Sequence, residues 1–324
     1  MGPHPAVAAV RLAVRRALAD APAVRVGAPV LVACSGGADS LALLAATVFE
    51  ARDRPWQVVG VTVDHGLQEG SQAQAARVVE QMAELGVAET VGIRVRVDGE
   101  GSGPEAAARE ARYAVLDQVA ERFAAAAVLL GHTLDDQAET VLMGLARGSG
   151  GRSIAGMRRG FGRYLRPLLD LRRSDTEAAC AAQGLEFWRD PHNTDPRFLR
   201  ARVRHDVLPV LERELGPGVA ETLARTADSL RTDMEALDEI AVSALADPDA
   251  LAVAVLAAQP AAVRRRVLRL AALRAGALDA ELFSGHVLAL DALVTGWHGQ
   301  KWIDLPGHLR ARRSAGAVVF ERTD

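Results

Sequence analysis

Lysine and cysteine are both scarce in this chain of 324 residues. Lys301 is the only lysine, so arginine carries almost all of the positive charge. The two cysteines, Cys34 and Cys180, form no CxxC pair, which argues against a zinc knuckle, an iron–sulfur site or a dithiol relay. Two cysteines also provide no disulfide framework, and this favours a reducing, cytoplasmic location.

Long apolar runs and a strong net charge are absent as well. No stretch approaches the roughly 20 apolar residues of a membrane span, so we expect no membrane partner. The net charge of −3 gives no overall positive field that would attract nucleic acid. Hydrophobic residues make up 49% and charged residues 24%, a globular balance that suits one large or two ordinary domains.

The first half of the chain alternates between short apolar runs and helical patterns. The pattern predicts strands at residues 30–33, 57–63, 90–97 and 127–130, and helices at 40–50, 71–85, 104–123 and 134–146. This alternation is typical of a parallel sheet built from βαβ units. Ligands of such sheets bind at the carboxyl ends of the strands, here residues 34–40, 64–67, 98–103 and 131–136. Upstream, Val7, Val10, Val14 and Leu18 share one helical face, which favours a packed helix over a transit peptide.

The second half has a different character. A glycine-rich, basic stretch follows Gly148, and from about Gly216 the pattern is helical. We predict helices at residues 219–245, 261–274 and 279–294, then short strands around the Pro306–Gly307 turn. The sequence therefore predicts an α/β parallel-sheet domain at 1–215. A smaller, mainly helical domain with a few short terminal strands is expected at 216–324.

The stretch "VLVACSGGADSLALL" leads from a predicted strand into a predicted helix. Small residues let a ligand approach the backbone, and the N–H groups of the loop and helix start can bind phosphate oxygens. Asp39 beside such a site makes sense if a metal lies between acid and phosphate. The alternative is a plain turn in which Asp39 or Ser40 caps the helix. The stretch lacks the lysine of a Walker loop and is not GxGxxG.

Other strand ends carry polar groups too. Asp64 and His65 follow the second strand, whereas Arg109 and Arg112 share a face of a later helix. The stretch "GHTLDDQAET" places His132 at a strand end, with Asp136, Glu139 and Thr140 on one helical face. Its alternative role is to cap the helix through Thr133 and Asp136. Several such stretches at one sheet edge favour a functional site.

Taken in order, these segments resemble the tRNA(Ile)-lysidine synthetase family of the PP-loop ATP pyrophosphatase superfamily. The matching segments are residues 35–40, 64–67, 108–113, 132–140, 147–157, 166–169 with Arg172, 188–195 and 200–211, and "KWIDLPG" near the end also fits. The sequence departs from the family pattern at Gln68, Thr133 and Ala201. The resemblance implies an adenine nucleotide alpha hydrolase-like fold.

The resemblance also implies a reaction. ATP adenylates O2 of the first anticodon cytidine of the CAU-anticodon isoleucine tRNA, and the ε-amine of L-lysine then displaces AMP. The nucleotide site would comprise Ser35, Gly36, Gly37, Ala38, Asp39, Ser40, Asp64 and His65. Asp39 and Asp136 would hold Mg²⁺, Arg112 would stabilise developing charge, and His132 or Glu139 would accept a proton from lysine.

Two arginine-rich segments are candidates for the tRNA backbone. The residues that we expect to contact tRNA are Arg109, Arg147, Arg158, Arg159, Arg200, Arg202 and Arg204. The alternative for these segments is a solvated basic face. Three other functions stay open. A tRNA thiolase would normally need paired cysteines, and a small-molecule amide synthetase would not need the arginines. A stress-type ATP-binding protein would bind ATP without hydrolysing or transferring it. The oligomeric state is open, with a homodimer as one option.

Overall fold

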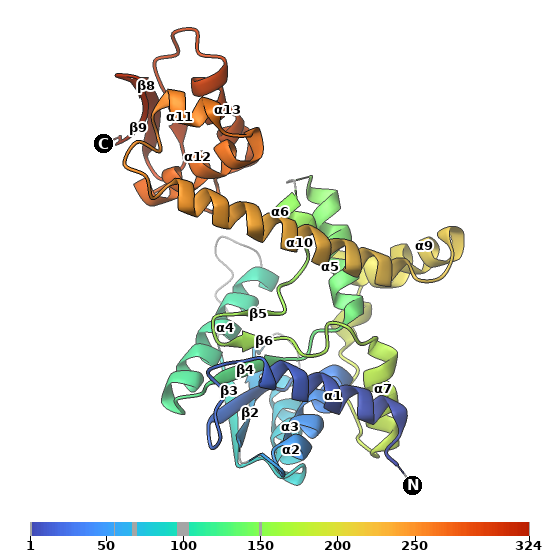
Figure 1. Cartoon of the computed structure of the whole chain (residues 1–324). Coiled ribbons are helices and arrows are strands. Elements are labelled where there is room, and N and C mark those ends of the chain that lie inside the picture. Colours follow the sequence, from blue (N-terminus) through green and yellow to red (C-terminus); the bar gives the residue numbers. More distant parts are fainter. Residues whose placement is uncertain (1, 55, 67–69, 96–103, 149–150, 324) are drawn as a thin grey trace. The chain divides into compact units, whose positions relative to one another are not determined.

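A computed structural model describes residues 2–54, 56–66, 70–95, 104–148 and 151–323 (Figure 1). Its contacts divide the chain into two compact units. The first comprises Met1–Thr140 with Met157–Ala224, and the second Val141–Gly156 with Arg225–Asp324. The segment 141–156 thus packs with the second unit, although it precedes the boundary that the sequence suggests. Leu67 and Gln68, residues 96–103 and residues 149–150 of the predicted elements and motifs lie outside the described part.

A six-stranded sheet organises the first unit. Its strand order is β3-β2-β1-β4-β6-β5, and all neighbours are parallel except β5, which pairs antiparallel with β6. The strands are β1 (Pro29–Ala33), β2 (Gln57–Asp64), β3 (Glu89–Arg94), β4 (Ala127–Leu130), β5 (Gly160–Phe161) and β6 (Tyr164–Leu165). The predicted parallel sheet is confirmed, and β5 and β6 extend it beyond the predicted strands.

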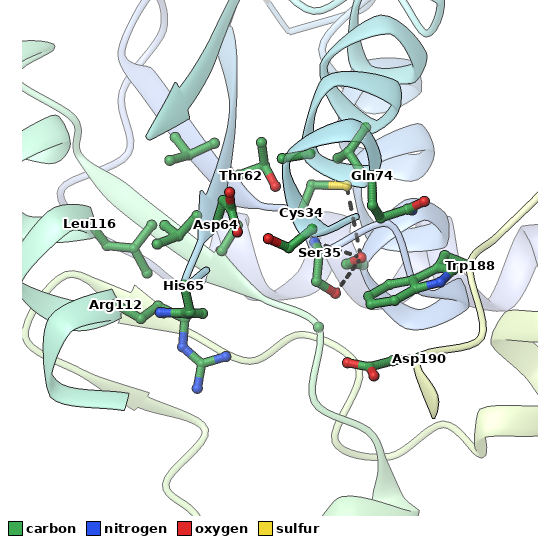
Figure 2. Close-up of a pocket in the computed structure, with 18 of the residues that line it drawn as sticks. Cys34, Ser35, Thr62, Asp64, His65, Gln74, Arg112, Leu116, Trp188 and Asp190 are labelled. Atoms are coloured by element: carbon green, nitrogen blue, oxygen red, sulfur yellow. Dashed lines mark hydrogen bonds between the residues drawn. The ribbon is translucent and has the colours of Figure 1, made fainter. Parts of the chain in front are cut away.

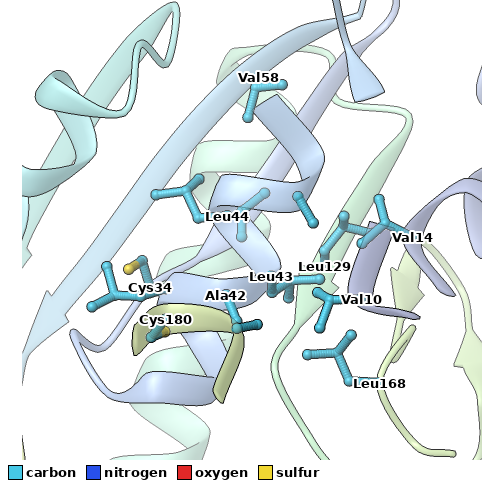
Figure 3. Packing of buried hydrophobic residues seen from close by; sticks show 14 of the residues in the cluster. Val10, Val14, Cys34, Ala42, Leu43, Leu44, Val58, Leu129, Leu168 and Cys180 are labelled. Atoms are coloured by element: carbon cyan, nitrogen blue, oxygen red, sulfur yellow. The ribbon is translucent and has the colours of Figure 1, made fainter. Parts of the chain in front are cut away.

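Helices cover both faces of this sheet. One face packs against α1 (Pro5–Ala19), α2 (Ala38–Glu50), α3 (Ser71–Glu84) and α7 (Arg173–Ala182), and the other against α4 (Pro104–Arg122). Val30 and Val32 face the first layer, whereas Leu31 faces the second, because side chains alternate along a strand. Figure 3 shows the first of these cores. The predicted amphipathic first helix is confirmed: its four apolar residues are at most 5% exposed.

The remaining helices of the first unit are short or shared with the second unit. They are α5 (Leu134–Arg147), α8 (Leu199–Arg202), α9 (Leu208–Leu215), a 3-10 turn at Pro191–Thr194, a π-helical turn at Val203–Val207 and the start of α10 (Val219–Ala244). The expected helix at 134–146 corresponds to α5, whereas sequence reasoning did not predict α7, α8 or α9. No helix in the described part of the chain has the length and apolar character needed to cross a membrane.

The second unit has its own core. It contains α6 (Gly151–Ile154), α11 (Val253–Ala258), α12 (Ala261–Ala275), α13 (Ser284–Thr295) and an antiparallel sheet of β7 (Ile303–Leu305), β8 (Leu309–Ser314) and β9 (Ala317–Arg322). The predicted terminal strands are confirmed. However, α13 starts at Ser284 rather than at residue 279. Arg269 ion-pairs with Asp279 and donates to the carbonyl of Leu282, which holds this stretch in a turn.

Candidate active site

The loop between β1 and α2 is tightly constrained. Gly36 has φ +82°, and a Cβ at this position would lie 2.5 Å from Cγ2 of Val78. Ser40 Oγ accepts a hydrogen bond from the Ser35 N–H at 3.1 Å and donates to the Gly37 carbonyl at 2.9 Å. The Gly36 carbonyl accepts from the Trp188 N–H at 2.9 Å. This glycine loop therefore has a fixed shape at the start of α2, as an anion-binding loop requires.

A cavity of about 320 Å³ opens beside this loop, at the carboxyl ends of β1, β2 and β4 (Figure 2). Asp64 and His65 line it from the end of β2. Asp64 Oδ1 accepts from the Gly66 N–H at 2.8 Å, and Asp64 Oδ2 lies 3.6 Å from Arg94 Nε. His65 Nδ1 is buried without a hydrogen-bond partner among the described residues. Burial, helped by Arg112, lowers the pKa of His65. Unmatched buried polar atoms indicate a ligand with polar groups of its own.

A second cavity of about 450 Å³ adjoins the first, and both are lined by His65, Arg112, Asp190 and His192. Its other lining residues include Arg109, Arg200, Arg204, Asn193 and Phe198. The rings of His192 and Phe198 lie 5.3 Å apart, centroid to centroid, with a tilt of 56°. This cavity thus combines guanidinium groups with an aromatic wall, which suits a nucleotide.

Three acids and three arginines form a compact cluster, in which Arg200 Nε lies 3.8 Å from Glu139 Oε2. Arg173 Nε lies 3.3 Å from Asp39 Oδ2, its Nη2 2.9 Å from Asp136 Oδ1 and its Nη1 3.6 Å from Glu139 Oε1. Arg204 approaches from another element, at 2.7 Å from Glu139 Oε1 and 3.3 Å from Asp136 Oδ1. Asp39 and Asp136 both lie in the first turn of a helix, where negative charge is favoured.

Each aspartate uses one carboxylate oxygen to accept a hydrogen bond from a threonine. Asp136 Oδ2 accepts from the N–H of Thr133 at 2.8 Å and from its hydroxyl at 3.0 Å. Asp39 Oδ1 accepts from the hydroxyl of Thr176. Burial raises the pKa of the Asp39 carboxyl to about 6, although Arg173 opposes this shift. Burial also acts to raise the pKa of Asp136, but Arg173 and its other neighbours outweigh it and lower that pKa. Asp136 therefore both caps α5 and belongs to the cluster.

His132 lies at the end of β4 as a neutral imidazole. Burial lowers its pKa to about 3, with Arg166, Arg112 and Arg109 acting in the same direction and Asp136 opposing them. Arg166 Nε donates to His132 Nδ1 at 3.2 Å, which places the imidazole proton on Nε2. Glu139, the other candidate base, is fully buried against Arg204. Both candidates thus have arginine partners, and the choice between them stays a prediction.

The structure brings most of the expected site residues to the two cavities and the acid cluster. Arg147, Arg158, Arg159 and Arg202 are instead exposed outside the cavity linings. Arg159 ion-pairs with Asp170, and Arg202 donates to the carbonyls of Pro196 and Arg197. Their role toward tRNA therefore stays a prediction.

Sequence reasoning counted Arg173 in an arginine-rich segment expected to contact tRNA and missed Thr176, although both side chains of α7 contact Asp39. One signal was available. Arg173 begins a helix, where the helix dipole disfavours a cation. A cation at that position therefore indicates an acidic partner elsewhere in the fold.

The acid cluster offers few carboxylate ligands for magnesium. Within the described ranges, no group of three or more His, Cys, Asp or Glu side chains is placed to hold a metal ion. Nucleotide-bound Mg²⁺ usually takes only one or two carboxylates and completes its coordination with phosphates and water. The pair Asp39 and Asp136 fits that requirement. The cysteines are buried, and burial raises the pKa of Cys34 and, to about 12, that of Cys180, so neither is a reactive thiol.

Comparison with known proteins covers both units. Residues 11–211 match the model of the PP-loop domain, and residues 251–319 match that of the TilS substrate binding domain. The tRNA(Ile)-lysidine synthase of Thermobifida fusca is 55% identical over 98% of each chain. That of Streptomyces coelicolor is 51% identical over 99% of this chain and all of its own.

The fold of this chain is similar to that of a solved structure. That structure is the U34-tRNA thiolase of Methanococcus maripaludis with its [4Fe-4S] cluster, with a TM-score of 0.59 and 19% identity over 69% of this chain and 79% of that one. At this identity the likeness concerns the fold alone.

Gly36 and Gly37 allow a matched test of the loop. In Gly36→Ala, the positive φ and the contact with Val78 should cost about 1–3 kcal/mol of unfolding free energy and weaken nucleotide binding. Gly37→Ala is the control, because φ is −76° there and the nearest atom, Ser35 Oγ, is 3.7 Å away. Urea unfolding and calorimetric ATP titration measure both effects. Equal losses in the two variants would contradict this account of the loop.

The neutral state of His132 predicts a pH dependence of stability. Because the folded-state pKa is about 3 and the unfolded value is 6.5, the unfolded chain binds more protons as pH falls below 6.5. The contribution of the neutral His132 imidazole to the unfolding free energy is therefore fully present above pH 6.5 and decreases toward pH 3. When the pH is lowered from 7.5 to 5, the unfolding free energy of wild type should fall by about 2 kcal/mol more than that of His132→Gln. The glutamine keeps an acceptor for Arg166. Parallel urea-unfolding curves for both proteins at the two pH values would contradict the buried neutral imidazole.

Proposed function

The chain belongs to the tRNA(Ile)-lysidine synthase family, and from this premise we propose how its residues carry out the reaction. The enzyme ligates L-lysine to C2 of the first anticodon cytidine of the isoleucine tRNA with a CAU anticodon. ATP first adenylates O2 of the cytidine and releases pyrophosphate, and the ε-amine of lysine then attacks C2 and displaces AMP. The products are lysidine, AMP and pyrophosphate. We place the enzyme in the cytoplasm.

The adjoining pair of cavities is the observation that carries the assignment of substrates. We place ATP in the first cavity, where the fixed glycine loop can bind phosphates, Asp64 lines the wall and His65 offers an unmatched ring nitrogen. The target cytidine, extruded from the anticodon loop, enters the arginine-lined cavity, where Phe198 and His192 form an aromatic wall. Because Arg112 lines both cavities, its guanidinium can stabilise charge where the cytidine oxygen meets the α-phosphate.

The acid cluster supplies the remaining chemistry. Asp39 and Asp136 would hold Mg²⁺, which when bound neutralises the charge of the departing pyrophosphate. The ε-amine of lysine is mostly protonated near pH 7, so a group of the enzyme must accept a proton before attack. To accept that proton at Nδ1, His132 must lose the hydrogen bond that Arg166 donates to it. Glu139 must likewise lose its hydrogen bonds with Arg204. Either residue therefore becomes a base only when substrates rearrange its arginine partner.

The tRNA contacts would extend over both predicted domains. We assign catalysis to residues 1–215 and additional tRNA binding to 216–324, in agreement with the substrate-binding model that matches residues 251–319. Arg109, Arg200 and Arg204 line the proposed cytidine cavity. The exposed Arg147, Arg158, Arg159 and Arg202 are candidates for the phosphate backbone. A small-molecule amide synthetase would need no such contacts and would release pyrophosphate without tRNA.

Separating the two half-reactions tests this proposal. With ATP labelled at the α-phosphate, the CAU tRNA and no lysine, the enzyme should form adenylated tRNA, which lysine then resolves. Asp39→Asn keeps the size of the side chain and should lower label transfer about a hundredfold or more while folding stays intact. Gel separation of labelled tRNA measures the result. Label on lysine, or pyrophosphate release without tRNA, would contradict the proposed order and substrate.

The same assay separates the two candidate bases. A residue that only accepts the lysine proton should spare adenylated tRNA and block its resolution. Among His132→Ala and Glu139→Gln, the variant that accumulates adenylated tRNA identifies the base. A variant that forms none has lost a group that holds ATP or metal.

The salt dependence of tRNA binding tests the exposed arginines. Each phosphate contact to a single strand contributes about −0.7 to the slope of log K against log salt. Arg158→Ala and Arg202→Ala should each flatten the slope by about that amount and leave ATP binding unchanged. Arg25→Ala, an exposed arginine outside these segments, is the control. An unchanged slope in the double variant would show that Arg158 and Arg202 belong to a solvated face.

A further inference from the structure

We propose that the guanidinium of Arg173 is an internal counter-cation that a divalent metal must displace from Asp39 and Asp136. The metal would consequently bind this enzyme well only together with ATP, whose phosphates give the displaced guanidinium new partners. The inference rests on the proposed function in one respect, the assignment of Asp39 and Asp136 as metal ligands. It adds a positioning role for Arg173 that sequence reasoning did not find.

Arg173 occupies the carboxylate oxygens that a metal would need. One oxygen of Asp39 is already bound by the hydroxyl of Thr176, and one oxygen of Asp136 by Thr133. The other oxygen of each is the one that Arg173 contacts, at 3.3 Å from Nε and 2.9 Å from Nη2. Arg204 Nη2 also contacts the Asp136 oxygen, at 3.3 Å, whereas the Asp39 oxygen is paired with Arg173. The Arg173 guanidinium and a metal therefore compete for the same two atoms.

The cluster depends on this cation. The side chains of Asp39, Asp136 and Glu139 are 20%, 9% and 0% exposed, so water screens their mutual repulsion poorly. Arg204 reaches Asp136 and Glu139, but in the described part of the chain the ion pair of Asp39 is made by Arg173. Loss of Arg173 would leave Asp39 as a buried, unpaired carboxylate, and this is strongly destabilising.

The main chain at Arg173 is fixed, whereas its side chain can change partners. The Arg173 N–H donates to Asp135 Oδ2 at 2.7 Å. The Arg173 carbonyl lies 2.7 Å from Thr176 Oγ1, whose single proton it shares with Asp39 Oδ1. Guanidinium binds phosphate as readily as carboxylate, through paired N–H donors. If phosphates take over Arg173, the metal gains Asp39 and Asp136. Metal and ATP should then strengthen each other's binding by the same factor.

The neighbouring arginine provides a matched control. Arg172 is 29% exposed against 23% for Arg173, and it also bridges several acids. Its partners are Asp135 at 3.1 Å, Glu212 at 3.6 Å and Glu221, so within the described ranges it pairs with acids other than Asp39 and Asp136. Arg172→Gln should therefore lower stability without changing the affinity for metal.

The experiment measures Mg²⁺ binding to the full chain in the absence of ATP. Calorimetry and thermal unfolding are recorded for wild type, Arg173→Gln, Arg172→Gln and the double variant Arg173→Gln with Asp39→Asn. We expect Arg173→Gln to have a lower Tm in EDTA, restored by millimolar Mg²⁺, and to bind Mg²⁺ at least about tenfold more tightly than wild type. The Tm of wild type and of Arg172→Gln should not respond to Mg²⁺ without ATP. The double variant should lose the tighter Mg²⁺ binding of Arg173→Gln.

Each outcome bears on the inference. If Arg173→Gln binds Mg²⁺ no more tightly than wild type, the inference is overturned, while lysidine formation by wild type still supports the proposed function. If Asp39→Asn retains full activity, the proposed metal site itself is wrong. Should Arg173→Gln fold only with Mg²⁺, that supports the inference. Should it not fold at all, Arg173→Lys replaces it. Its ammonium keeps a positive charge but lacks the fixed, paired donors of a guanidinium, so it must also give tighter Mg²⁺ binding than wild type.

Discussion

The crowding of three carboxylates at one edge of a sheet is the constraint on which the site depends. Asp39 and Asp136 begin α2 and α5, and these helices start together because their preceding strands, β1 and β4, are neighbours. Gly131 makes the approach close: a Cβ there would lie 3.1 Å from the backbone of Asp39. Glu139 follows one turn later and is fully buried. Acids this close need cations, and Arg173 and Arg204 supply them from distant parts of the chain.

The same electrostatic arrangement holds both candidate bases. His132 has lost its basicity through burial and the arginines around it, and Glu139 is held by Arg204. In the proposed reaction, substrates that bring phosphate and metal would redistribute these ion pairs. Under the proposed mechanism, proton transfer from lysine would then begin only after ATP, lysine and tRNA are all bound. Arginine suits the role because it stays charged at any accessible pH and binds carboxylate and phosphate alike.

Much of the site could be predicted because its signals are local. The glycine loop with its acid, the polar ends of β2 and β4, and the capping contact of Thr133 with Asp136 each lie within a few residues of sequence. Strand ends that share one edge then bring these pieces together by topology alone. The predicted start of α13 was wrong for the opposite reason. The contact of Arg269 with Asp279 spans 10 residues and lies outside any helical or strand period.

The sequence by itself determined the parallel sheet, the fixed glycine loop, the positions of Asp39, Asp136 and Glu139, and the family. Periodicity and turn chemistry act over short distances, so a single sequence records them. The tertiary structure alone decided which arginine meets which acid. Arg173 is 134 residues from Asp39 and 37 from Asp136 along the chain, and no local pattern links them. It also decided that Arg159 and Arg202 have partners within the protein and that His132 is neutral, because ion pairing and burial depend on contacts between segments remote in sequence.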